Sequence, residues 1–107
     1  MSYTIEYFNS RVQADIEAWP VDILADYARL VGLLIEHGPN LRMPYSRSMG
    51  RGLFELRAKG KEGIGRAFCC FLAGRRIVVL HAMVKKTDQT PERDLDLARR
   101  RVEAVRR

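Results

Sequence analysis

The sequence predicts an α+β fold in which two N-terminal helices pack on one face of a four-stranded, mainly antiparallel sheet, with a further helix at the C-terminus. Three observations predict it. Residues 53–84 alternate short apolar runs with glycine-containing breaks, residues 12–35 carry apolar side chains at helical spacing, and a strand-like segment precedes both. An apolar sheet face needs helices to cover it, and the chain supplies them directly before the sheet.

The C-terminal half is predicted to form an antiparallel meander with strands Leu53–Ala58, Arg66–Leu72 and Arg76–Val84. Because successive strand residues point to opposite faces, one face is predicted to hold Phe54, Leu56, Ala58, Ala67, Cys69, Phe71, Val78, Leu80, Ala82 and Val84. The other face then holds Glu55, Arg57, Arg66, Phe68, Cys70, Ile77, Val79, His81 and Met83. This assignment assumes an even number of residues in both connecting loops, since a single β-bulge moves residues to the opposite face.

The N-terminal half supplies the remaining elements. Tyr3–Phe8 alternates like a half-buried strand that can join the meander as its fourth member. Ser10 and Gln13 form a capping-box pattern at the start of a short helix. A second helix over residues 21–37 is predicted to end at Gly38, which Pro39 follows.

Two basic segments allow more than one interpretation. Residues 39–51 are predicted to be a loop with three arginines. A solvated loop is the simpler interpretation, and contact with single-stranded RNA, through stacking of Tyr45 and arginines on phosphate, is the functional one. From Thr90, the predicted N-cap, a helix with an apolar stripe and an arginine-rich end is expected to dock on the sheet or on a partner.

Composition indicates a single domain over residues 1–107. The formal net charge of +6 favours an anionic partner, of which nucleic acid is the usual one. The N-terminus has no basic and apolar signal pattern, and no apolar run approaches the length needed to span a membrane. We therefore expect no membrane association and a cytoplasmic protein.

The cysteine and histidine content argues against a disulfide and a metal site. Cys69 and Cys70 are adjacent in a predicted strand, so they face opposite ways and are poorly placed for a mutual disulfide. His37 and His81 have no cysteine or histidine neighbour at metal-ligand spacing. We expect neither a metal nor a cofactor.

The second face of the meander gathers the side chains best suited to chemistry: Arg57, Arg66 and His81, flanked by Lys59, Lys61, Lys85 and Lys86. Cleavage of RNA by its own 2′-hydroxyl needs groups that accept a proton, neutralise the phosphoryl oxygens and protonate the leaving 5′-oxygen. Arginine binds phosphate bidentately, and histidine transfers protons near neutral pH. A structural histidine with solvated lysines is the simpler interpretation of the same residues.

The runs GLFELR (residues 52–57), GKEGIGR (60–66), LHAMVKKT (80–87) and TP (90–91) resemble the HigB/RelE-type toxins of bacterial toxin–antitoxin systems, in particular the phage-derived HigB-like branch. The resemblance covers nearly the whole chain. It implies a RelE-like fold and a metal-independent endoribonuclease that cuts mRNA on the ribosome and halts translation. It also implies restraint by a cognate helix-turn-helix antitoxin of the HigA type.

Carried over by position, the resemblance implies a role for seven residues. Arg57 and Arg66 would bind the scissile phosphate, and His81 or Lys85 would transfer protons. RNA contacts would come from Lys59, Lys61 and Lys86, to which the functional interpretation of residues 39–51 adds Tyr45 and Arg47. The family commonly places aromatic residues where Cys69 and Cys70 stand, and a thiol at Cys70 cannot stack on a base.

Two other functions compete with this one. The chain is alternatively a non-catalytic basic module, a degenerate toxin that binds RNA or the antitoxin. The third function, ranked last, is DNA binding by the arginine-rich C-terminal helix, which has no recognisable DNA-reading motif.

Overall fold

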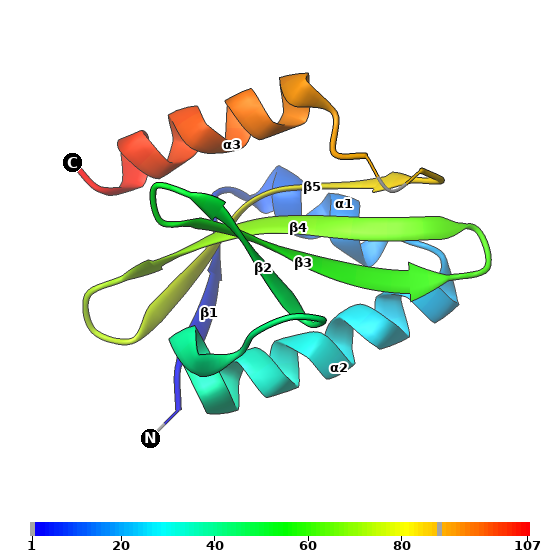
Figure 1. The fold of residues 1–107 in the computed structure, drawn as a ribbon, viewed down its shortest axis with the longest axis horizontal. Coiled ribbons are helices and arrows are strands. Elements are labelled where there is room, and N and C mark those ends of the chain that lie inside the picture. Colours follow the sequence, from blue (N-terminus) through cyan, green and yellow to red (C-terminus); the bar gives the residue numbers. More distant parts are fainter. Residues whose placement is uncertain (1, 88) are drawn as a thin grey trace.

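The computed structural model describes residues 2–87 and 89–107, and within them one five-stranded sheet carries helices on both faces (Figure 1). The elements in chain order are β1 (Thr4–Tyr7), α1 (Ser10–Glu17), α2 (Val21–His37), the 3-10 turn η1 (Gly38–Asn40), β2 (Ser46–Gly50), β3 (Leu53–Gly60), β4 (Gly63–Leu72), β5 (Arg76–Lys85) and α3 (Glu92–Val105). The strand order is β1-β5-β4-β3-β2, with β1 parallel to β5 and the other neighbours antiparallel. The predicted α+β class and meander are confirmed.

The sheet has five strands where the sequence predicts four. The additional strand is β2, which lies inside the segment predicted to be a loop and pairs with β3. Its sequence, SRSMG, shows no apolar alternation, so it carried no strand signal. The segment forms a strand because its backbone can hydrogen-bond to the otherwise free edge of β3. Arg99 of α3 also donates to the carbonyls of Met49 and Gly50 at the end of β2.

The first core lies between the sheet and the two N-terminal helices, as predicted. α2 packs on β3 and β4, and α1 packs on β5. The buried apolar side chains of this core include Val12, Ile16, Ile23, Tyr27, Leu30, Leu34, Phe54, Leu56, Ala58, Ala67, Cys69, Ile77, Val79 and Ala82. Trp19, at the elbow between the helices, packs against Tyr27 with ring centroids 5.5 Å apart. Gly65 of β4 lies directly beneath this elbow, because a Cβ there would come within 2.6 Å of the Trp19 ring.

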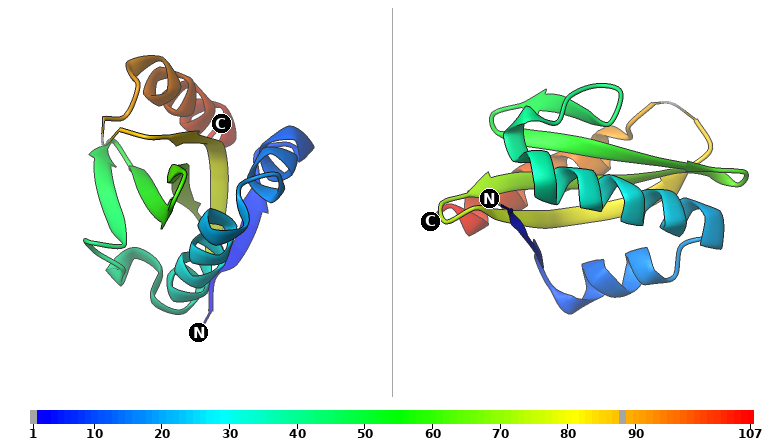
Figure 2. Two further views of the ribbon diagram at one scale, coloured as in Figure 1. Left: turned by 90° about the vertical axis from the view of Figure 1, so that its right-hand side faces the viewer. Right: turned by 90° about the horizontal axis from the view of Figure 1, so that it is seen from below.

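The second core lies on the opposite face, under α3 (Figures 1 and 2). Ala98 and Val102 of α3 are buried against Leu53, Phe68, Cys70, Val78 and Leu80. The apolar stripe of the last helix therefore docks on the chain's own sheet, one of the two partners the sequence left open. This placement covers part of the face that carries the predicted catalytic residues.

β5 departs from the predicted pattern at two places that offset each other. The β4–β5 loop has three residues, 73–75, and the prediction assumed an even number. The first residues of β5 therefore lie on the faces opposite to those predicted. Ile77 and Val79 are in the first core, and Val78 and Leu80 are in the second. A β-bulge then restores the pattern, because Phe68 pairs with His81 and Cys69 with Val79, leaving Leu80 as the extra residue. His81 therefore faces the predicted side.

The helix ends differ in detail from the prediction. Asn9, not Ser10, caps α1, since its Oδ1 accepts the amide of Val12 at 2.9 Å. Thr90 does not cap α3, which begins at Glu92 after Pro91. Gly38 ends α2 as predicted, with a left-handed φ of 55°. Among the described helices, none combines the length and apolar character needed to cross a membrane.

Candidate functional site

Three rows of side chains cross the sheet on the α3 side. Residues directly opposite each other in antiparallel strands point to the same face. The register places Arg47, Glu55, Phe68 and His81 in one row, Arg57, Arg66 and Met83 in the next, and Lys59, Ile64 and Lys85 in the outermost row. The structure thus brings the four predicted catalytic residues onto one face, with Arg47 and Lys59 beside them.

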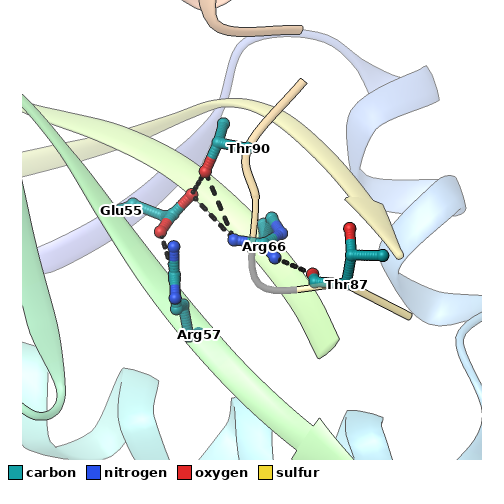
Figure 3. A network of polar contacts seen from close by, with 5 residues as sticks. All are labelled: Glu55, Arg57, Arg66, Thr87 and Thr90. Carbon is teal, nitrogen blue, oxygen red and sulfur yellow. Dashed lines mark hydrogen bonds and ion pairs between the residues drawn. The ribbon is translucent and has the colours of Figure 1, made fainter. Parts of the chain in front are cut away.

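Glu55 lies between two arginines at the centre of this face (Figure 3). Its Oε1 accepts a hydrogen bond from Arg57 Nε at 2.5 Å, and its Oε2 lies 3.6 Å from Arg66 Nη1. The side chains of Glu55 and Arg66 are fully buried, whereas that of Arg57 is 14% exposed. Buried charges are tolerated when they are paired and hydrogen-bonded, and this carboxylate forms an ion pair with each of the two guanidinium groups.

The connection between β5 and α3, described at residues 86–87 and 89–91, covers this network. The carbonyl of Thr87 accepts a hydrogen bond from Arg66 Nη2. The hydroxyl of Thr90 accepts from Arg66 Nη1 at 3.2 Å and donates to Glu55 Oε2 at 2.8 Å. A phosphate can therefore reach Arg66 only if this connection moves, while part of the Arg57 side chain, 14%, is already exposed.

His81 is held from two sides. Its Nε2 lies 2.7 Å from Oδ1 of Asp94, in the first turn of α3. Its ring stacks on that of Phe68, with centroids 6.0 Å apart and planes inclined by 11°. These two contacts fix the orientation of the ring. Because the His81 side chain is 18% exposed, part of the ring stays open to a ligand.

Lysines surround the outer end of the face. Lys59, Lys85 and Lys86 are exposed, and Lys59, Lys61 and Lys86 line a hollow of about 600 Å³ at the β3–β4 turn. The turn is anchored to α2, because the backbone amides of Lys59 and Lys61 donate to Asp26 at 2.8 Å and to Asp22 at 2.7 Å. The three predicted RNA-binding lysines therefore stand close together, and two of them, Lys59 and Lys61, lie on a turn that α2 holds in place.

Arg47 and Tyr45, the two predicted RNA contacts in residues 39–51, lie in different places in the structure. Arg47 is exposed and shares the row of Glu55 and His81. Tyr45 instead lies beside α2, where the guanidinium of Arg29 stands 5.8 Å from its ring centroid. Tyr45 is 39% exposed, so its ring has a free surface, but it lies outside the network around Glu55.

Both cysteines are buried, one in each core. Burial raises the pKa of the Cys69 thiol strongly and raises that of Cys70. Cys70 packs in the second core beneath α3 and is not exposed on the face that carries Arg57 and His81. The absence of an aromatic ring at this position therefore removes no surface on which a base could stack.

Three arginines of the basic C-terminal helix have structural partners. Arg99 donates to Met49 O at 2.7 Å, Arg101 to Leu80 O at 2.7 Å, and Arg106 to Arg51 O at 3.4 Å. The Arg101 guanidinium also lies 4.6 Å from the ring centroid of Phe8. These arginines fasten α3 to the sheet, so the arginine-rich sequence reflects docking of the helix as well as net charge.

Four residues central to the site, Glu55, Thr87, Thr90 and Asp94, were not predicted to belong to it, and Thr90 was predicted only as a helix cap. Glu55 was predicted on the correct face. A single carboxylate in a strand of apolar and basic residues could have indicated that it pairs with the arginines. The contacts of Thr87, Thr90 and Asp94 carried no local signal, because they depend on the path of the chain after β5.

Comparison with known proteins places the chain in a family. Residues 14–103 match the family described as phage-derived protein Gp49-like (DUF891). No curated protein matches the chain. Among solved structures, it resembles the archaeal RelE–RelB complex from Pyrococcus horikoshii OT3, with a TM-score of 0.55, 17% identity, and coverage of 78% of this chain and 96% of that one. At this identity the likeness concerns the fold, and it confirms the predicted RelE-like architecture.

The family match extends over most of the chain, and the structure has the RelE-like arrangement of helices and sheet. The sequence resemblance to HigB/RelE-type proteins is confirmed by both. The chain belongs to the Gp49-like phage-derived family of RelE/HigB-type toxins of toxin–antitoxin systems.

Proposed function

We propose that this toxin is a metal-independent endoribonuclease that cuts mRNA on the ribosome. The observation that supports it best is the convergence of Arg57, His81 and Lys85 on one sheet face, with a rim of exposed lysines. Such a face can attract a polyanion through its charge and offers both arginine and a proton-transfer group where the phosphate would lie. The same face carries Arg47 and Lys59 toward the flanking nucleotides.

The proposed reaction is attack of a 2′-hydroxyl on the adjacent phosphorus. The 2′-oxygen forms a bond to phosphorus while the bond from phosphorus to the 5′-oxygen breaks. His81 takes the proton of the 2′-hydroxyl, and the ammonium group of Lys85 gives a proton to the leaving oxygen. Arg57 neutralises charge on the non-bridging oxygens, which grows in the transition state.

Arg66 contributes in one of two ways. In the closed arrangement it holds Glu55 and, through that carboxylate, the guanidinium of Arg57. If the connection after β5 moves away, the Nη2 atom that now bonds to the carbonyl of Thr87 becomes available to a phosphoryl oxygen. We propose that binding on the ribosome favours this open arrangement, in which Arg66 joins Arg57 on the scissile phosphate.

The proposed partner in the resting state is a helix-turn-helix antitoxin of the HigA type. The archaeal structural relative was solved as a complex of RelE with RelB, which supports a protein partner for this chain as well. Co-expression with the neighbouring gene product tests this directly. A stable complex that suppresses toxicity supports the proposal, and a neighbouring product that neither binds nor suppresses contradicts it.

The burial of Arg66 favours one competing function, that of a non-catalytic module that binds RNA or the antitoxin. In such a protein the network around Glu55 would be purely structural, as the full burial of Glu55 and Arg66 permits. The exposed lysines would then serve binding alone.

Cleavage of mRNA in a purified translation system separates the two functions. Wild-type protein is expected to cut mRNA on ribosomes but not the same RNA free in solution. His81→Ala should lower the cleavage rate by about 10²-fold or more, because a proton-transfer group typically contributes that much. Arg57→Ala should also lower it strongly.

Arg11→Ala is the matched control, because it removes the same charge from an exposed position on α1, where the side chain pairs with Asp15. It should cut at the wild-type rate. If folded wild-type protein leaves ribosome-bound mRNA intact, the endonuclease proposal is wrong and the binding module stands.

A further inference from the structure

The contact between His81 and Asp94 links the last helix to the proposed proton-transfer group. The two side chains meet at 2.7 Å and are 18% and 23% exposed. A carboxylate only accepts hydrogen bonds, so the ring nitrogen that faces it, Nε2, must carry the hydrogen. In the neutral imidazole the other nitrogen, Nδ1, is then the unprotonated one.

We propose that Asp94 is a positioning residue for RNA cleavage, which holds His81 as the Nε2–H tautomer and leaves Nδ1 to take the proton of the 2′-hydroxyl. This inference rests on the proposed endonuclease function and deepens it. A carboxylate in this position also stabilises the imidazolium that forms when Nδ1 accepts the proton. The same division of roles operates wherever a buried or half-buried carboxylate orients a catalytic histidine.

Two side chains of α3, Ala98 and Arg101, fix Asp94 relative to His81. Asp94, Ala98 and Arg101 stand at positions i, i+4 and i+7, so they share one face of the helix. Ala98 is fully buried in the second core. Arg101 donates to the carbonyl of Leu80, the residue directly before His81. The helix is therefore fastened to β5 beside the histidine, and Asp94 is held in place by contacts other than its own.

Phe68 restricts the ring from the other side. Its stacking on His81 leaves the imidazole little freedom to turn over, so the two ring nitrogens keep distinct surroundings. Because Phe68 is fully buried, it provides a rigid support. The last helix thus contributes a functional carboxylate to the face that it partly covers.

A purely structural role for the pair is the competing explanation, in which Asp94 only ties the start of α3 to the sheet. The two explanations differ in what Asp94→Asn changes. A structural tie predicts lower stability and normal chemistry in the folded fraction. A positioning role predicts normal folding with slower chemistry, since asparagine has nearly the same shape but can also present its amide hydrogens to the ring.

The test compares Asp94→Asn with Asp96→Asn on ribosome-bound mRNA. Both substitutions remove one negative charge near the start of α3, and Asp96 is exposed. Asp94→Asn is expected to lower kcat at least about 10-fold, short of the loss in His81→Ala, with KM and the melting temperature unchanged. Asp96→Asn is expected to match wild type in all three.

The tautomer is read separately from the ¹⁵N chemical shifts of the His81 ring at a pH where the ring is neutral. Wild-type protein should show an unprotonated Nδ1 and a protonated Nε2. Asp94→Asn should show a mixture of the two tautomers. This measurement needs neither ribosomes nor activity.

Each outcome decides the matter. If wild type cuts and Asp94→Asn cuts equally fast, or if wild type shows the Nδ1–H tautomer, the role of Asp94 is wrong while the endonuclease stands. A fall in activity that only follows a fall in melting temperature also overturns it in favour of the structural tie. If wild-type protein does not cut at all, the proposed function itself fails and the role of Asp94 fails with it.

Discussion

Glu55 decides how the charged residues of the site are arranged. Two arginines on neighbouring strands repel each other, and the carboxylate between them makes their proximity favourable. The period of two along β3 and β4 was enough to predict that Arg57 and Arg66 share a face. His81 lies on the same face because the odd β4–β5 loop and the bulge at Leu80 offset each other. The burial of Arg66 was not predictable, because the atoms that cover it belong to Thr87 and Thr90, which follow in a segment without a regular pattern.

The two arginines are expected to differ in their effect on stability. Arg66→Ala should lower the free energy of unfolding by about 3–5 kcal/mol, because it leaves Glu55 buried without its fully buried partner. Arg57→Ala should cost less, about 1.5–3 kcal/mol, which is typical of a hydrogen bond to a charged group at a partly exposed site. Urea unfolding measures both.

This difference determines which variant can report on catalysis. A loss of cleavage in Arg66→Ala is meaningful only where the variant is still folded, whereas Arg57→Ala tests the chemistry more directly. Equal destabilisation by the two substitutions would contradict the assigned burial of Arg66.

At the scale of elements, the β3–β4 turn depends on carboxylates from α2. The pKa of Asp22 lies below its usual value, chiefly because the backbone amide of Lys61 donates to it, and the amide of Ile23 adds a second hydrogen bond. A carboxyl whose pKa is lower in the folded state stabilises the fold while it is ionised. Its contribution is complete above the unfolded pKa of about 4 and is lost as the pH falls through the folded pKa.

Asp22→Asn should therefore destabilise the protein at pH 7 and make less difference at pH 2.5. Urea unfolding at the two pH values measures the change. Asp15→Asn, on the exposed face of α1, is the control and should show little difference at either pH. A constant gap between wild type and Asp22→Asn across this range would show that the hydrogen bonds to Asp22 do not depend on its charge.

The connection after β5 is fastened by the hydroxyl of Thr90 and by the carbonyl of Thr87. Thr90→Val removes the hydroxyl and keeps the shape, so it should lower the free energy of unfolding by about 1–3 kcal/mol and speed hydrogen exchange at residues 86–87 and 89–90. Thr87→Val keeps the backbone carbonyl and is the matched control, with an expected change within about 0.5 kcal/mol.

The same pair of variants tests the proposed opening. If movement of the connection exposes Arg66, Thr90→Val should bind RNA more tightly than Thr87→Val, although it is less stable. Unchanged exchange and binding in Thr90→Val would show that its hydroxyl does not hold the connection closed.

At the scale of the whole molecule, two cores share one sheet. The first contains α1 and α2 and the second contains α3, and every strand from β3 to β5 contributes to both. Unfolding of one core therefore exposes one face of the sheet whose other face forms the second core. We expect the chain to unfold as a single cooperative unit, as small single domains usually do.

Val102→Ala tests this cooperativity. It removes two methyl groups from the second core and should cost about 2 kcal/mol. Trp19 is the only tryptophan and lies in the first core, so its fluorescence reports on the opposite face. The unfolding midpoint should fall equally by tryptophan fluorescence and by far-UV circular dichroism. A drop seen only by circular dichroism would mean that α3 detaches independently.

The sequence by itself determined the α+β class, the meander, the two helices over its apolar face and the grouping of Arg57 with Arg66. These follow from local periodicity, which is set by the geometry of helices and strands. Tertiary structure alone decided the fifth strand, the bulge at Leu80, the docking of α3 and the contacts of Thr87, Thr90 and Asp94. Each of these depends on hydrogen bonds or packing between segments far apart in the chain, which leave no periodic trace in the residues themselves.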